Sequence, residues 1–147
     1  MNLSMPEPVH QTTYRVLYGD TDAAGVVYYA NYLRFFERGR TEYMREMVLT
    51  YRDIENQGLI LPVIESYSRY KAPAAYDDLL VIETSLVELK NVSCRFNYRI
   101  YRNDNDNSRT LLAKGYTVHA SVNRNGKLTR FPANLIEKLE KIISITS

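Results

Sequence analysis

Apolar residues recur at helical spacing between about Tyr29 and Val48, which predicts one long amphipathic helix. The apolar stripe of this helix consists of Tyr32, Phe36, Gly39, Tyr43 and Met47. Gly39 costs about 1 kcal/mol of helix propensity relative to alanine, so either another backbone approaches it closely or the glycine is simply tolerated. On another face, Arg38 and Glu42 have the four-residue spacing of an ion pair.

Strand-like alternation replaces the helical period from Ile60 onward, and a first strand rich in β-forming residues precedes the helix. The predicted strands are Thr12 to Tyr18, Ile60 to Tyr70, Leu79 to Leu89, Val92 to Arg102 and Thr110 to Asn123. In the fourth of these, apolar residues such as Phe96 alternate with polar ones such as Arg95, so one face belongs to the core. Short connections, including an Asn125-Gly126 hairpin turn, predict a largely antiparallel sheet.

Helical spacing returns after Pro132, a residue that the start of a helix tolerates. Its apolar face consists of Leu135, Ile136, Leu139, Ile142 and Ile143. The chain is therefore expected to be an α+β protein, in which a curved sheet covers one long early helix and a second helix follows at the C-terminus. No linker or repeat divides the sequence, so residues 1–147 are expected to form one domain.

The composition is that of an ordinary globular protein, with 147 residues, 45% hydrophobic and 24% charged. A net charge of +2 is too small to indicate nucleic-acid binding. The single cysteine, Cys94, cannot form an internal disulfide and favours a reducing compartment. No apolar run reaches the ~18 residues of a membrane span, and the start of the chain lacks the apolar core of a signal peptide. A cytoplasmic protein without a membrane segment is expected.

Candidate chemistry gathers between Tyr18 and Tyr32, where Asp20 and Asp22 directly precede the long helix. A carboxylate there has a possible role as a base, and the helix start offers unpaired N–H groups and a positive dipole end. The structural alternative is that Asp22 accepts N–H bonds within its own loop, as in an Asx turn.

A calcium loop is a further alternative, since Asp20, Asp22 and Gly25 fit its first, third and sixth positions. Ala24 at the fifth position lacks a ligand oxygen, and Asn31 at the twelfth lacks a bidentate carboxylate. No metal site is expected.

The segment YGDTDAAGVVYYANYLRFFERGRTEYMR, Tyr18 to Arg45, resembles the opening of the hotdog-fold acyl-CoA thioesterases of the 4-hydroxybenzoyl-CoA thioesterase type. It is most similar to the branch associated with the Tol-Pal cell-envelope system. The resemblance continues weakly through Tyr70 to Asp78 and, in element order, over nearly the whole chain. It implies a sheet wrapped around the central helix, a homodimer with joined sheets and shared active sites, and often a homotetramer of two such dimers.

The resemblance also implies roles in hydrolysing an acyl-CoA to a carboxylic acid and CoA. Asp22 matches the catalytic aspartate, acting as general base toward water or as nucleophile. The backbone N–H of Tyr29 would polarise the thioester carbonyl, and Asp20 fits a scaffold role. Tyr18 matches a tyrosine beside the aspartate that hydrogen-bonds the acid or the substrate, although a strand-end aromatic filling an interface is equally consistent. Tyr29 stands where this branch has histidine, so a histidine-assisted mechanism is in doubt.

The phosphates of CoA call for basic residues, and Lys90, Arg95 and Arg99 are the candidates. His119 and Cys94 are expected to be structural, since each lies in a predicted strand. No cofactor is expected, because the CoA thioester is itself the substrate.

Other function classes remain as alternatives. A hydroxyacyl thioester dehydratase on the same fold would use a histidine on the loop or helix, and no histidine occurs between Gln11 and Val118. A non-catalytic module would bind acyl-CoA or an acyl carrier protein, or take part in an envelope-associated complex. The absence of a Gly-x-Ser-x-Gly motif argues against an α/β-hydrolase.

Overall fold

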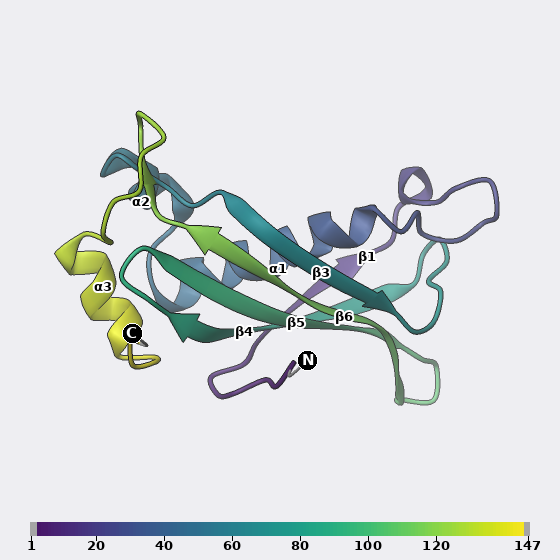
Figure 1. Ribbon diagram of the computed structural model, residues 1–147. Helices are drawn as coiled ribbons and strands as arrows, with labels where there is room; N and C mark the ends of the chain where they lie inside the picture. The colour runs from purple at the N-terminus through teal and green to yellow at the C-terminus, as the bar shows by residue number, and fades with distance from the viewer. Residues whose placement is uncertain (1–2, 146–147) are drawn as a thin grey trace.

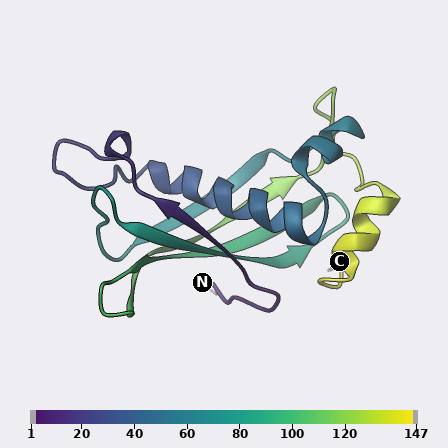
Figure 2. The same cartoon turned by 180° about the vertical axis from the view of Figure 1, so that it is seen from behind.

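A five-stranded antiparallel sheet curves around one long helix in the computed structural model, which describes residues 3–145 (Figure 1). The order of its strands is β1-β4-β5-β6-β3. Their bounds are His10–Arg15 for β1, Val63–Tyr70 for β3, Leu79–Leu89 for β4, Ser93–Asn103 for β5 and Arg109–Ala120 for β6. Helix α1, Asn31–Met47, lies along the concave face, as the view from behind shows (Figure 2). The predicted α+β architecture is confirmed.

Short elements complete the fold at the end of the sheet where α1 ends. Helix α2, Tyr51–Asn56, follows α1, and strands β2, Leu59–Ile60, and β7, Val122–Asn123, form a two-stranded sheet. Helix α3, Ala133–Glu140, lies beside the β4–β5 hairpin (Figure 1). At the opposite end, Tyr18–Asp20 forms one 3-10 turn, η1.

Several predicted boundaries were wrong for identifiable reasons. The first strand ends at Arg15, so Tyr18 lies in η1. The strand predicted from Ile60 to Tyr70 is split at Leu61 and Pro62, since proline cannot donate to a strand ladder. Helix α1 begins at Asn31, so Tyr29 lies just outside it. Helix α2 was not predicted.

The core forms where α1 packs on the sheet. Phe36 of α1 stacks on Tyr98 of β5, with ring centroids 4.4 Å apart. A methyl group on Gly39 would approach Ile82 Cγ2 to 2.8 Å and would also meet the hydroxyl of Thr84. A close approach at Gly39 is therefore present, but side chains of β4 make it, and the prediction that another backbone would do so was wrong.

The polar face of α1 differs from the expected pattern. Arg38 does not pair with Glu42; its Nε donates to the Thr13 carbonyl at 3.1 Å, and its guanidinium lies over the Tyr14 ring. Glu42 pairs instead with Arg45 at 3.4 Å. This predicted ion pair was wrong, because contacts with β1 take Arg38 away from its helical neighbour.

No helix between residues 3 and 145 has both the length and the apolar character needed to cross a membrane.

Candidate active site

A small hairpin, here called the site loop (residues 21–27), projects from the sheet end at which α1 starts (Figure 1). Thr21 and Val27 form its antiparallel bridge, and the Asp22 N–H donates to the Val26 carbonyl at 2.9 Å. Gly25 has φ +81°, a conformation that glycine adopts without strain, and its N–H donates to the Asp22 carbonyl at 3.0 Å. The site loop therefore has a fixed backbone around Asp22.

Asp20 anchors this loop to the rest of the protein. Its carboxylate is buried and accepts hydrogen bonds from the Tyr14 hydroxyl at 2.6 Å and the Leu17 N–H at 2.8 Å. Arg34 of α1 pairs with the other oxygen at 3.4 Å. The Asp20 carbonyl accepts from the Tyr28 N–H and from Asn31 Nδ2, both at 2.9 Å. These contacts give Asp20 the scaffold role expected of it and fix the start of α1 relative to β1.

Asp22 is exposed, and only one of its carboxylate oxygens is engaged. Oδ1 accepts the Ala24 N–H at 2.9 Å, which is the Asx turn considered as the structural alternative. Oδ2 has no hydrogen-bond donor within residues 3–145. The pKa of the Tyr28 hydroxyl is raised, mainly by the adjacent Tyr29 side chain and also by the negative charge of Asp22. One oxygen of Asp22 thus orients the side chain, while the other has no partner among the described residues.

The Tyr29 peptide lies immediately before α1. The Tyr28 N–H donates to Asp20 and the Asn31 N–H donates to the Tyr28 carbonyl, whereas the N–H of Ala30 has no acceptor among the described residues. Among the described residues, no acceptor is bonded to the N–H of Tyr29. Its carbonyl accepts from the Tyr70 hydroxyl at 3.1 Å. An unused donor at the positive end of a helix is suited to stabilising an oxyanion.

Tyr70 contacts the candidate site, and sequence reasoning missed it. It ends β3, and its ring packs against Tyr32 of α1 at a centroid distance of 5.2 Å. Together with its hydrogen bond to Tyr29, this contact fixes the edge strand to the helix start. Its place at the start of the second, weaker segment of resemblance was the available signal.

Tyr18 does not bond to Asp22 within the described chain. Its side chain is 78% exposed, and its ring meets Tyr76 edge-on at 5.6 Å. The exposed ring is available for contact with another chain. The predicted hydrogen bond from the Tyr18 hydroxyl to the acid or the substrate stays a prediction.

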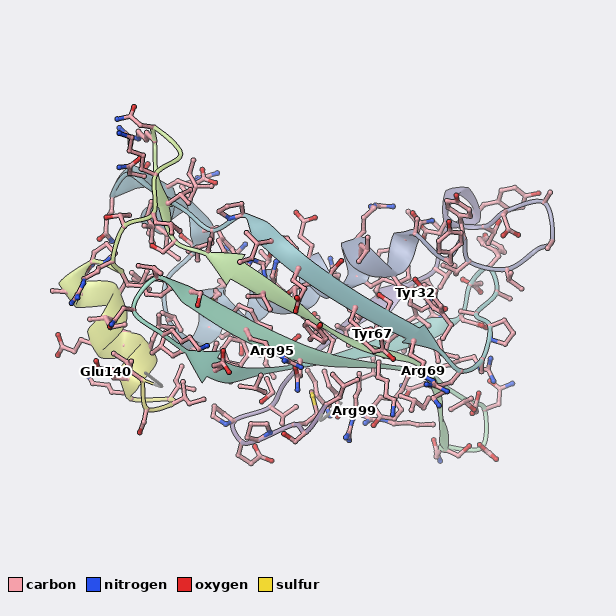
Figure 3. The ribbon with its side chains drawn as sticks, viewed as in Figure 1. Tyr32, Tyr67, Arg69, Arg95, Arg99 and Glu140 are labelled. Carbon is pink, nitrogen blue, oxygen red and sulfur yellow. The ribbon has the colours of Figure 1, made fainter. Side chains whose placement is uncertain are left out.

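The candidate CoA residues lie away from Asp22 in the single chain. Lys90 is in the β4–β5 connection at the opposite end of the sheet and pairs with Glu88 at 3.5 Å. Arg95 and Arg99 project from the face of β5 that α1 does not cover (Figure 3). Arg95 stacks on the Tyr116 ring at 3.9 Å. One chain therefore does not join these three residues to Asp22.

His119 and Cys94 lie in the core. The pKa of His119 is lowered to about 4, mainly by burial, against a raising effect of the Leu61 carbonyl that its Nδ1 contacts at 3.0 Å. Burial raises the pKa of the Cys94 thiol to about 12. Neither has the exposure or the pKa that catalysis at neutral pH requires. Across residues 3–145, no three His, Cys, Asp or Glu side chains are grouped as metal ligands would be.

Comparison with known proteins agrees with this geometry. Residues 16–139 match the family described as the thioesterase-like superfamily. The chain belongs to this family. It is 42% identical over 115 residues to acyl-CoA thioesterase YbgC of Haemophilus influenzae, an alignment that covers 78% of this chain and 80% of that protein.

Solved structures extend the comparison to the fold. A hypothetical protein from Aquifex aeolicus superposes with a TM-score of 0.80 at 32% identity, over 88% of this chain and 98% of that one. The 4-hydroxybenzoyl-CoA thioesterase of Pseudomonas sp. strain CBS-3 gives a TM-score of 0.80 at 24% identity, with 88% and 98% covered. The hotdog fold is therefore confirmed, while membership of the Tol-Pal branch stays a prediction.

Proposed function

We propose that this protein hydrolyses acyl-CoA thioesters to a free carboxylic acid and CoA. The observation that carries the proposal is the presence of two unused groups, the Tyr29 N–H and Asp22 Oδ2, on a helix start and an adjoining loop that Asp20 fixes. The name of the Haemophilus influenzae relative, acyl-CoA thioesterase, supports the same reaction.

The proposed chemistry assigns one role to each group. The thioester oxygen accepts the Tyr29 N–H, which stabilises the negative charge that develops when the carbonyl is attacked. Asp22 takes a proton from water as the new C–O bond forms, or attacks the carbonyl itself to give a mixed anhydride that water then hydrolyses. In both routes the C–S bond breaks, and CoA leaves as a thiolate that gains a proton.

The proposed active unit is a homodimer of single hotdog domains (residues 1–147), and two such dimers form a tetramer. Strand β3 supports this arrangement, because it ends the sheet and leaves one row of backbone groups without a strand partner among the described residues. Val63 and Ile64 of β3 are also exposed, at 44% and 61%. In such a dimer Lys90, Arg95 and Arg99 of a second copy would be available to the CoA phosphates, and Tyr18 would meet an interface.

The alternative is a non-catalytic module that binds acyl-CoA or an acyl carrier protein. The hydrogen bond from the Ala24 N–H to Asp22 favours it, because a purely structural Asp22 would make the same contact. A cytoplasmic location and an envelope-associated role belong to the proposal as expectations from sequence.

Thiol release from short-chain, long-chain and aromatic acyl-CoAs tests the proposal. Asp22→Asn keeps the Oδ1 acceptor of the Asx turn but cannot act as base or nucleophile, so turnover should vanish while the melting temperature is unchanged. A wild-type protein that releases no thiol, beside an Asp22→Asn variant that binds CoA equally well, would establish the binding module. The matched control is Asp53→Asn on the exposed side of α2, which should retain full activity.

A further inference from the structure

Two adjoining hollows that share Glu37 and Arg40, here together called the helix groove, lie beside α1 on the side of the edge strand. Its first part, about 230 Å³, lies between Leu33 and Glu37 of α1 and Val63 of β3. Its second part, about 240 Å³, continues to Tyr51 of α2. Arg40 lines both parts. Because Leu33 lies in the first turn of α1, the helix groove begins near the helix start and leads away from it along α1.

Arg40 is a half-buried cation without an acidic partner in residues 3–145. Glu37 and Glu55 line the same groove, yet neither forms an ion pair with it within 4.0 Å. Arg34, the other arginine at the groove, is already paired with Asp20. Removing a guanidinium from water without a counter-ion is unfavourable, so Arg40 gains from an anionic ligand.

Tyr51 supplies a second unused donor at this position. Its hydroxyl oxygen is buried and has no hydrogen-bond partner. Burial raises the pKa of this hydroxyl, and the charge of Arg40 opposes the shift, which places the two groups near each other. The Tyr51 hydroxyl therefore remains protonated and can donate at any physiological pH.

The wall behind Arg40 holds polar groups that are already satisfied. Tyr98 and Thr117 share a 2.6 Å hydrogen bond, and Thr117 Oγ1 lies 2.8 Å from His119 Nε2. Nδ1 of His119 faces the Leu61 carbonyl, so Nδ1 carries the proton and Nε2 accepts from Thr117. The donors left for a ligand are Arg40 and Tyr51. A set made only of donors matches a ligand that only accepts, such as a carboxylate.

We infer that the far end of the helix groove recognises a carboxylate at the distal end of the acyl group, held by Arg40 and Tyr51. The inference rests on the proposed function, because the thioester must lie at Tyr29. Arg40 is ten residues beyond Ala30, so the two are about 15 Å apart along the helix axis. Because the zigzag of an extended carbon chain with bonds of about 1.5 Å advances about 1.25 Å per carbon, this span corresponds to about a dozen carbon atoms. The substrate class is a medium-chain dicarboxylic acid carried as its mono-CoA thioester.

The test compares dodecanedioyl-CoA, the mono thioester, with dodecanoyl-CoA, which has the same length and no distal charge. The measured quantity is the ratio of kcat/KM for the two substrates. We expect this ratio to exceed one in the wild type and to fall about 10- to 100-fold in Arg40→Gln, as loss of a hydrogen bond to a charged group gives. The 12-hydroxydodecanoyl thioester should rank between the two substrates.

Two further variants keep the result interpretable. Tyr51→Phe removes a hydroxyl that has no partner, so it should fold normally and lower the same ratio by a smaller factor, even if Arg40→Gln does not fold. Arg38→Gln is the matched control, because Arg38 lies on another face of α1, over Tyr14, and the ratio should stay at the wild-type value.

The outcomes separate this inference from the proposed function. Hydrolysis of dodecanoyl-CoA with no preference for the dicarboxylic substrate, and a ratio unmoved by Tyr51→Phe, would overturn the carboxylate site alone. Equal falls in Arg40→Gln and Arg38→Gln would also overturn it, since the effect would then be general to helix charge. No thiol release from any of the thioesters would overturn the proposed function itself.

Discussion

The Tyr14 hydroxyl donates a 2.6 Å hydrogen bond to Asp20, six residues further along the chain. Tyr14 belongs to β1, whereas Asp20 ends η1, so this bond connects the sheet to the segment that precedes the site loop. The pKa of Tyr14 is raised, first by burial and then by its bond to the Asp20 carboxylate. The Tyr14 hydroxyl therefore remains protonated across the neutral pH range, and the hydrogen bond persists there.

Tyr14→Phe should destabilise the protein by about 1.5 to 3 kcal/mol, the range for a hydrogen bond to a charged group. Asp20 would keep the Leu17 N–H and Arg34 as partners, so folding should survive. Urea denaturation measures the loss. Tyr18→Phe is the control, because the Tyr18 ring is exposed and its hydroxyl has no hydrogen bond in the described chain. Equal stability of the two variants would show that the Asp20 contact contributes little.

Gly39→Ala should destabilise the protein although alanine is the better helix former. The gain in helix propensity is about 1 kcal/mol, whereas overpacking against Ile82 and Thr84 costs typically 1 to 3 kcal/mol. Thermal unfolding should show a lower melting temperature. In Gly19→Ala the new methyl group meets no atom within 4 Å, so that variant should unfold near the wild-type temperature. A stabilised Gly39→Ala would mean that β4 gives way easily.

Much of the fold could be predicted because its signals are local. The apolar stripe of α1 follows from residue spacing, and Gly39 indicated its close contact. Helix α2 was missed because it has six residues and buries only Ile54. Its signal was Thr50, whose side chain accepts the Asp53 N–H at 3.1 Å as an N-cap. A capping residue without an apolar stripe is weak evidence for a helix.

In the candidate site too, features with a local sequence signal could be predicted, and contacts between distant residues could not. The structural role of Asp20 and the proposed role of the helix start were both suggested by an aspartate-rich loop before a helix. The contact between Tyr70 and Tyr29 joins residues 41 positions apart, so no local pattern contains it. The sequence also could not show that Arg40 lacks an acidic partner. Spacing along α1 indicates which charges are near each other, but contacts with the sheet decide which of them form ion pairs.

Buried His119 should make stability depend on pH below neutrality. Its folded pKa of about 4 lies below the ordinary value of 6.5, so the unfolded chain binds the proton more readily. The folding stability that depends on neutral His119 is fully present above pH 6.5. It is lost as the pH falls toward 4, by about 3 kcal/mol in total. The measurement is the unfolding free energy of wild type and His119→Gln at pH 7, 5.5 and 4.5. The wild-type advantage should shrink across this series, and a constant advantage would exclude His119 as the titrating group.

The role of the Tyr29 N–H can be tested by removing that hydrogen alone. Replacing Tyr29 with its α-hydroxy acid analogue turns the Tyr28–Tyr29 amide into an ester, which deletes the N–H while the side chain stays the same. The folded chain should tolerate the change, because no described residue accepts from this N–H. Turnover should fall by about 10²- to 10³-fold in kcat, the usual cost of losing one oxyanion donor. Tyr29→Ala deletes the side chain and keeps the N–H, so it should lose far less in kcat. If the ester retained wild-type kcat while Tyr29→Ala lost activity, the side chain and not the peptide would be the catalytic group, and the oxyanion donor would have to be another group.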